Sequence, residues 1–170
     1  MTVNDRGFPG WRGLTLVSLI LCLIIIFSGK YLFTGTTRVE PPVPYWSFVS
    51  GHKNLSVFQV KQILDLTARC SAVTGVRQSI LLSIIEVESD YEPDARANSD
   101  IGLCQINSKI WWFADFDIER NINGMCVILS HYLLFEHGSV YRAVRRYNGI
   151  NSDTFASRVL SGARKIDEQK

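Results

Sequence analysis

The stretch Ile80-Leu81-Leu82-Ser83-Ile84-Ile85-Glu86-Val87-Glu88-Ser89 predicts a mostly apolar helix that ends in an unusual carboxylate. With 3.6 residues per turn, Glu88 shares one face of this helix with Leu81, Ile84 and Ile85. Because those three side chains are apolar, this face should be the buried one. The sequence therefore places a carboxylate where a hydrophobic side chain is expected.

Burial should change the proton affinity of the Glu88 carboxyl group. An apolar environment disfavours the charged form, so the pKa of Glu88 is expected to rise. The helix C-terminus acts in the same direction, because its last carbonyl groups carry partial negative charge. Glu86 lies on a mixed face that can stay in water. A glutamic acid protonated near neutral pH is suited to general acid catalysis, whereas the alternative for Glu88 is a structural carboxylate that reaches solvent.

Length and composition narrow the class of protein. The chain of 170 residues fits one compact domain with appendages, and its net charge of +2 is too small to indicate a nucleic-acid partner. Cysteines occur at positions 22, 70, 104 and 126, without CxxC or His/Cys metal spacing. There is no P-loop and no dinucleotide fingerprint. We therefore expect no metal, no organic cofactor and no nucleic acid as partner.

The N-terminal part predicts a membrane anchor. Residues 13–33 are mostly apolar and long enough to span a bilayer, which takes roughly 20 residues. Phe27 and Phe33 stand where a signal-peptide cleavage site needs small residues, which favours an uncleaved single transmembrane helix. The arginines in residues 1–12 favour a cytoplasmic N-terminus, with the rest of the chain exported.

A spacer and a domain follow the predicted anchor. Residues 34–55 include Glu40-Pro41-Pro42-Val43-Pro44, which favours extended polyproline geometry and predicts a spacer. The aromatic residues that follow, starting at Tyr45, can dock on the domain or lie at the membrane surface. Residues 56–170 are expected to form one domain.

The predicted domain is mainly α with a short irregular or β segment over residues 92–109. Ser56 and Gln59 match a capping box, so a helix should start there and run to about Ala72 before Gly75. Its inward residues are expected to be Val57, Val60, Leu64 and either Ala68 or Ile63. The other predicted helices are 80–89, 124–137, a short one from Ser139 to the Tyr147-Asn148-Gly149 stop, and a last one from Ser152.

An aromatic cluster lies between the irregular segment and the apolar helix. It consists of Trp111, Trp112, Phe113 and Phe116. These rings can pack in the core or stack on sugar rings, and the sequence leaves both interpretations open.

Four short motifs resemble those of the lytic transglycosylase family, which has a lysozyme-like fold. Residues 87–93, VESDYEP, resemble its "ES-x-aromatic-x-P" signature, and residues 99–108, SDIGLCQINS, resemble its "GLMQI" segment. The second match is closest to transglycosylases of secretion and conjugation systems. Residues 121–124 and 147–149 resemble the "N-x-x-G" and "YNG" motifs. The order and spacing of the four motifs, over about residues 57–160, make the resemblance specific.

The resemblance implies a reaction and roles for particular residues. Family members cleave the β-1,4 bond between N-acetylmuramic acid and N-acetylglucosamine in peptidoglycan and leave a 1,6-anhydro product. A single carboxylate can serve as acid and then as base, and Glu88 is the candidate. The other implied site residues are Ser89 and Tyr147, which would hold and orient the carboxyl group, Gly102, Leu103 and Gln105, which would line the sugar cleft, and Asn148, which would shape the turn or touch substrate.

Some positions depart from the family pattern and keep alternatives open. Cys104 occupies the usual Met position, and Ile150 replaces the second glycine of "YNGG". Asp90 and Asp100 are candidate second carboxylates, which would allow hydrolysis by water, as in goose-type lysozyme. The other alternative is a non-catalytic scaffold that binds the wall.

The resemblance and the predicted anchor together imply partners and a location. The partners would be peptidoglycan glycan strands, the membrane through the N-terminal helix, and a secretion, conjugation or phage entry apparatus. The catalytic domain would be periplasmic, or part of a phage particle. In an exported domain the cysteines can form one disulfide and leave one thiol, or stay buried and reduced, or exchange with Cys22.

Overall fold

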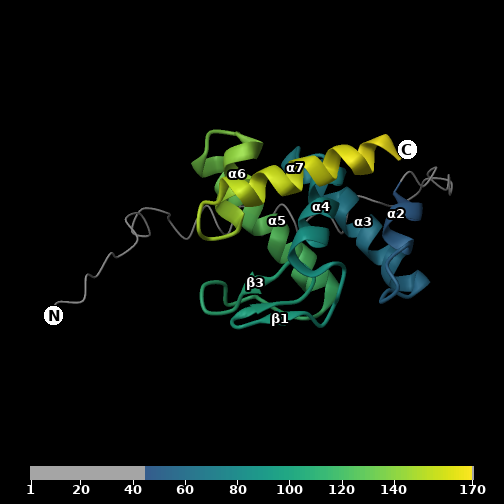
Figure 1. Ribbon diagram of the computed structural model, residues 1–170. Coiled ribbons are helices and arrows are strands. Elements are labelled where there is room, and N and C mark those ends of the chain that lie inside the picture. Colours follow the sequence, from purple (N-terminus) through teal and green to yellow (C-terminus); the bar gives the residue numbers. More distant parts are fainter. Residues whose placement is uncertain (1–44, 170) are drawn as a thin grey trace, which may run out of the picture. The chain divides into compact units, whose positions relative to one another are not determined.

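The computed structural model describes residues 45–169, and this part of the chain is mainly α with a small sheet (Figure 1). The expected class, mainly α with a short β segment, is confirmed. The strands are antiparallel in the order β1-β2-β3. The elements are α2 (Trp46–Ser50), α3 (Val57–Thr74), α4 (Gln78–Ser89), β1 (Arg96–Ala97), β2 (Asp100–Ile101), β3 (Ile106–Asn107), α5 (Ile118–Phe135), α6 (Val140–Tyr147) and α7 (Asp153–Glu168).

Side-chain caps set the starts of several helices. The capping box at α3 is confirmed: the Gln59 N–H donates to Ser56 Oγ (3.3 Å), and the Ser56 N–H donates to Gln59 Oε1 (2.8 Å). The helix ends at Gly75, whose φ of 72° is left-handed. Ser139 and Ser152 cap α6 and α7 as expected. Each cap accepts a hydrogen bond from a backbone N–H that the helix itself leaves unpaired.

The start of α5 differs from the sequence prediction. The helix begins at Ile118, before the expected start at Gly124. The reason is Asp117, whose carboxylate accepts a hydrogen bond from the Arg120 N–H (2.9 Å) and caps the helix. Because of this earlier start, Asn121 lies inside the helix.

The buried face of α3 also differs in part. Val57 was expected to face inward and is 72% exposed, because it is the first residue of the helix and lies beyond the core. Ala68 is exposed as well, whereas Ile63, the alternative to it, is buried. The buried positions of α3 are Val60, Ile63, Leu66, Thr67 and Cys70.

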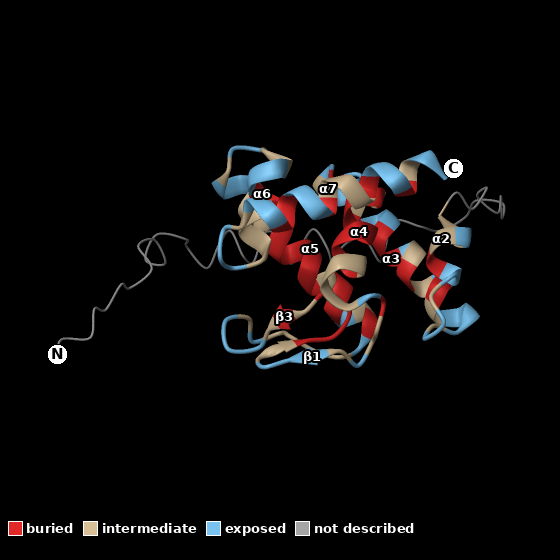
Figure 2. Ribbon diagram, in the orientation of Figure 1, coloured by how far each residue is buried: buried red, intermediate tan, exposed pale blue. Residues whose placement is uncertain are grey.

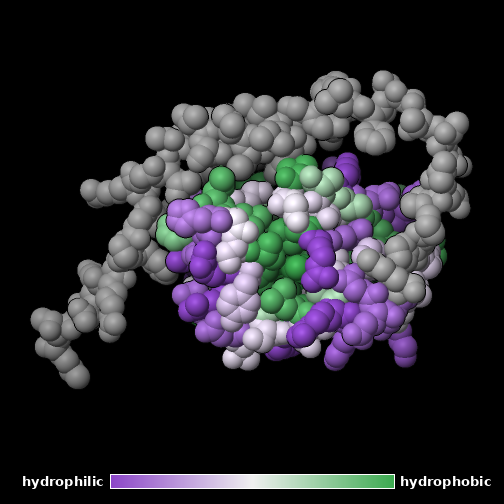
Figure 3. Space-filling model, turned by 90° about the horizontal axis from the view of Figure 1, so that it is seen from above, coloured by the Kyte–Doolittle hydropathy of each residue, from purple (hydrophilic) through white to green (hydrophobic). Residues whose placement is uncertain are grey.

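The core is centred on α4, which packs against both α3 and α7. Leu81, Ile84 and Ile85, the expected inner face of α4, are fully buried. Figure 2 shows the buried residues concentrated on α4 and α5. On the face that carries α6 and α7, Figure 3 shows a strip of hydrophobic surface between hydrophilic flanks.

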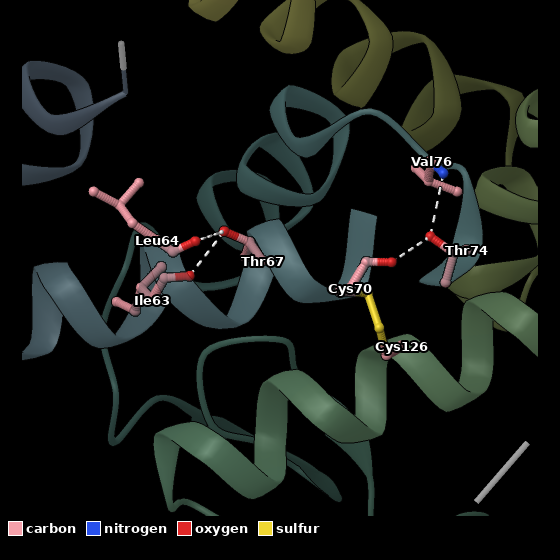
Figure 4. The surroundings of a disulfide bond; sticks show 7 residues. All are labelled: Ile63, Leu64, Thr67, Cys70, Thr74, Val76 and Cys126. Atoms are coloured by element: carbon pink, nitrogen blue, oxygen red, sulfur yellow. Dashed lines mark hydrogen bonds between the residues drawn. A yellow bond between two sulfur atoms is a disulfide. The ribbon is translucent and has the colours of Figure 1, made fainter. Parts of the chain in front are cut away.

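A disulfide joins α3 to α5. Cys70 and Cys126 are bonded, with their Cα atoms 5.7 Å apart (Figure 4). Cys104 is a buried free thiol. Of the alternatives that the sequence left open, the structure therefore has one disulfide and one thiol, and Cys22 lies outside the described residues. The bond closes a long loop, with a sequence separation of 56 residues. Such a crosslink stabilises a domain mainly by restricting its unfolded chain.

Helix α2 lies in the segment expected to be spacer, residues 34–55. Its Val49 is fully buried, and the ring of Phe48 lies 6.0 Å from that of Tyr91. Of the two alternatives for the aromatic residues here, docking on the domain is the one observed. None of the helices in residues 45–169 combines the length and the apolar character that a membrane span needs. The predicted anchor, residues 13–33, lies outside the described part of the chain.

Helices α4 and α7 approach closely at Gly162 and Ser83, and this contact allows a test of the core packing. A Cβ added to Gly162 of α7 would overlap the Oγ of Ser83, a buried hydroxyl without a hydrogen-bond partner in the described part of the chain. We expect Gly162→Ala to lower the free energy of unfolding by about 1–3 kcal/mol. In a Ser83→Ala background the same change should cost close to nothing, because the overlapping atom is gone. Chemical denaturation of the four proteins of this cycle measures the coupling, and equal costs in both backgrounds would contradict the close crossing.

Candidate active site

Glu88 lies in the last turn of α4, beside the fully buried Ile84 and Ile85. Its own side chain is only partly exposed. Its pKa is raised from 4.5 to about 8, first by burial and then by the charge of Asp100, while the charge of Arg158 acts in the opposite direction. The carboxyl group is thus protonated at neutral pH and still reaches the surface.

Two charged residues from different elements act on Glu88. Asp100 comes from β2 and is partly exposed, and Arg158 comes from α7 and is exposed. Of the two candidate second carboxylates, only Asp100 is among the groups that shift the pKa of Glu88. The side chain of Asp90 is 84% exposed and lies 3.3 Å from His52 Nδ1. Asp100 is therefore the carboxylate that the fold brings to Glu88.

The backbone beside Glu88 forms a tight turn from Gly102 to Gln105. The Gln105 N–H donates to the Gly102 carbonyl (3.0 Å), and the Gly102 N–H donates to the Ala95 carbonyl (2.8 Å). Gly102 has a φ of +74°, and a Cβ there would overlap the side chain of Asn121. Glycine is therefore required at position 102 both by backbone conformation and by space.

Side chains from three helices hold this turn in place. Ser89 of α4 donates its hydroxyl proton to the Leu103 carbonyl (2.7 Å), and Tyr147 of α6 donates its own to the Cys104 carbonyl (2.8 Å). From α5, the Asn121 amide donates to the Ile101 carbonyl (3.0 Å), and its oxygen accepts from the Cys104 N–H (2.7 Å). The turn is thereby connected to α4, α5 and α6 at consecutive backbone groups.

These contacts differ from the roles that the family resemblance implies. Ser89 and Tyr147 were expected to hold the carboxyl group of Glu88, but both hydroxyl protons go to backbone carbonyls of the turn. Gln105 was expected to line a sugar cleft, and its amide protons go to the carbonyls of Ala95 (3.1 Å) and Gly102 (2.9 Å). The hydroxyl groups instead position the wall against which Glu88 lies.

The remaining expected site residues have different exposures. Leu103 and Cys104 are fully buried, so the Cys104 thiol does not lie on an open surface. Burial raises the pKa of that thiol well above its usual value, and the charge of Glu88 raises it further. Asn148 is partly buried and ends α6. Tyr147 also has a strongly raised pKa, caused first by burial and then by nearby charges that include Glu88.

Asn121 and Arg158 are site residues that the sequence left without a role. The signal for Asn121 was present, since it is the first residue of the "N-x-x-G" motif. Its role could not be derived because the capping Asp117, and with it the true helix start, was not identified. Arg158 is exposed, and the packing of α7 on α4 brings its charge near Glu88.

No metal site is present among the described residues, where no group of at least three His, Cys, Asp or Glu side chains is placed to bind an ion. A hollow of about 590 Å³ lies elsewhere, between the start of α3, the segment after α4 and the start of α5. Its lining includes Phe58, Glu92 and Asp117 and none of the expected site residues.

Comparison with known proteins found no matching family model, curated protein or solved structure.

The raised pKa of Glu88 predicts a dependence of stability on pH. Between pH 4.5 and about 8 the folded chain keeps this proton while the unfolded chain loses it, so the free energy of unfolding falls as pH rises. Glutamine does not titrate. Glu88→Gln should therefore match the original protein below pH 4.5 and be more stable at pH 8, by about 2–4 kcal/mol. Denaturant unfolding across this pH range checks it, and a difference independent of pH would contradict the raised pKa.

Proposed function

We propose that this protein is a membrane-anchored peptidoglycan lytic transglycosylase with a lysozyme-like catalytic domain. The observation that carries the proposal is the position of Glu88, which is protonated up to a pH of about 8 and close enough to Cys104 of the Gly102–Gln105 turn to raise the pKa of its thiol. A general acid needs this combination of a proton at neutral pH and access to the surface.

The arrangement of the motifs supports the same proposal. Each of the segments that resemble the family contributes to a single hydrogen-bond network. The first contributes Ser89, the second the Leu103 and Cys104 backbone, the third Asn121 and the fourth Tyr147. Segments that match a family by chance have no reason to meet at one turn.

The proposed reaction needs only one carboxyl group. Glu88 gives its proton to the glycosidic oxygen as the bond from that oxygen to C1 of the muramic residue breaks. The resulting carboxylate then takes the proton of the muramic 6-hydroxyl, whose oxygen forms the new bond to C1. The products are a free 4-hydroxyl on N-acetylglucosamine and a 1,6-anhydro end, with no water consumed. Arg158 favours the charged form of Glu88 in the intermediate stage.

A second reaction is favoured by one specific observation, the proximity of Asp100 to Glu88. Glycosidases that use water place a second carboxylate near the acid, as a base or nucleophile. Asp100 would then activate water in place of the muramic 6-hydroxyl, and the enzyme would be a muramidase. The third alternative, a wall-binding scaffold, predicts binding to sacculi without solubilisation.

The anchor and the partners belong to the same proposal. Residues 13–33 would hold the domain on the outer side of the membrane, and the segment up to Tyr45 would limit its reach. A tethered enzyme opens the wall only locally. Such local cleavage suits the passage of a secretion or conjugation apparatus, or of phage DNA, better than bulk lysis.

The first functional prediction concerns the acid itself. Glu88→Gln should abolish release of soluble fragments from purified sacculi, because the amide cannot donate the required proton. Glu86→Gln is the matched control, since it makes the same change on the same helix and should retain activity. Mass spectrometry identifies the ends, because anhydro ends are lighter than reducing ends by one water. Normal release by Glu88→Gln would refute the assignment.

The second functional prediction separates the two reactions. If Asp100 acts only through its charge, Asp100→Asn should lower the pKa of Glu88, which moves the fall of kcat/KM at alkaline pH to a lower pH. The products should remain anhydro muropeptides. The alternative is that Asp100→Asn lowers activity by about a hundredfold or more and that the unaltered protein produces reducing ends. This result would identify Asp100 as the base of a hydrolase.

A further inference from the structure

Trp112 is the most exposed large hydrophobic residue of the described chain, at 85%. It lies in the loop between β3 and α5, within the cluster that the sequence left open between core packing and sugar stacking. For this ring, core packing is excluded by its exposure. An indole that presents its area to water is available for contact with a ligand.

The loop that carries Trp112 is held firmly on both sides of it. The Trp111 N–H donates to the Asn107 carbonyl (2.8 Å), and the Ala114 N–H donates to the Trp111 carbonyl (3.1 Å). The neighbouring Phe113 packs against Gly124 of α5, where a Cβ would lie 3.2 Å from its ring. The exposure of Trp112 is thus a property of a fixed loop.

A series of ring contacts leads from Trp112 toward the candidate active site. Trp112 lies 5.8 Å from Phe113, Phe113 lies 5.5 Å from Trp111, and Trp111 lies 6.0 Å from His131 of α5. His131 contacts Tyr132 at 5.2 Å, and Tyr132 is close enough to Tyr147 to influence its pKa. Ring contacts thus join Trp112 to Tyr132 of α5, and Tyr132 acts on Tyr147 through its charge.

The loop with Trp112 and the turn after α6 extend toward the same side of the molecule, to the left in Figures 1 and 2. This second turn carries Ile150, which is 80% exposed and stands where the family pattern has glycine. Two segments on this side therefore carry exposed apolar side chains, Trp112 and Ile150.

We propose that Trp112 forms a saccharide-stacking subsite that binds a pyranose ring of the glycan strand at a distance from the bond that is cut. This inference rests on the proposed function. The C–H groups on one face of a hexopyranose pack against an indole as other apolar groups do. The exposed Lys109 and Asp117 flank the loop and give the ring polar neighbours, which suits a ligand rich in hydroxyl groups.

The subsite is tested by binding of chitohexaose, a neutral hexamer of N-acetylglucosamine. The full chain with Glu88→Gln, kept in detergent micelles, is titrated while the indole N–H signals are followed by NMR. We expect the Trp112 signal to move with saturation, and Trp112→Ala to weaken binding about fivefold to tenfold. Trp112→Tyr should retain most of the affinity, because a stacking ring remains. Phe58→Ala removes another exposed ring (75%) and should leave the affinity unchanged.

The outcomes separate this inference from the proposed function. An unmoved Trp112 signal, or equal affinities of Trp112→Ala and its parent, overturns the subsite, whether or not sacculi are cleaved. The subsite is also overturned if the Trp112 indole shows NMR contacts to detergent acyl chains and its signal does not move on addition of the sugar. That result would indicate a membrane contact instead. If the original chain releases nothing from sacculi but Trp112 still responds to chitohexaose, the subsite stands and the transglycosylase proposal fails.

Discussion

The structure around Glu88 depends on the hydrogen bonds that fix the Gly102–Gln105 turn against the helices. Its carbonyl and N–H groups would otherwise be buried without partners, which is costly. Ser89, Asn121 and Tyr147 each satisfy one or more of these groups from a different helix. The turn therefore holds together α4, α5 and α6, and it joins the small sheet to the helical core.

The environment of Glu88 follows from this constraint. A carboxyl group keeps a strongly raised pKa only where water is excluded on at least one side and where the wall beside it cannot relax. The buried Leu103 and Cys104 supply that wall, and the helical side chains prevent it from moving away. Asp100 and Arg158 then act in opposite directions on a pKa already set by burial. Keeping this group buried and protonated lowers the free energy of unfolding at neutral pH. The disulfide between Cys70 and Cys126 stabilises the domain and offsets part of this loss.

Features that depend on neighbouring residues in the chain could be predicted from the sequence. The capping box of Ser56, the glycine stop at Gly75 and the burial of the face that carries Glu88 are of this kind. The start of α5 could not, because an Asp before an isoleucine is a weaker signal than the apolar run that follows. The partners of the Ser89 and Tyr147 hydroxyl groups also escaped prediction, because a side chain near a carboxylate in the sequence can still donate its proton to backbone that folds beside it.

The same reasoning changes what the motifs mean physically. Ser89, Asn121 and Tyr147 position the turn, so their substitution should alter the pKa of Glu88 and the shape of its surroundings without removing a group that touches the reacting atoms. Glu88 is the carboxyl group of this site that burial keeps protonated at neutral pH. If the proposed reaction is correct, the family pattern at these positions describes a scaffold for one acid, and the choice between intramolecular attack and water depends on Asp100, which the fold brings to the same site from the sheet.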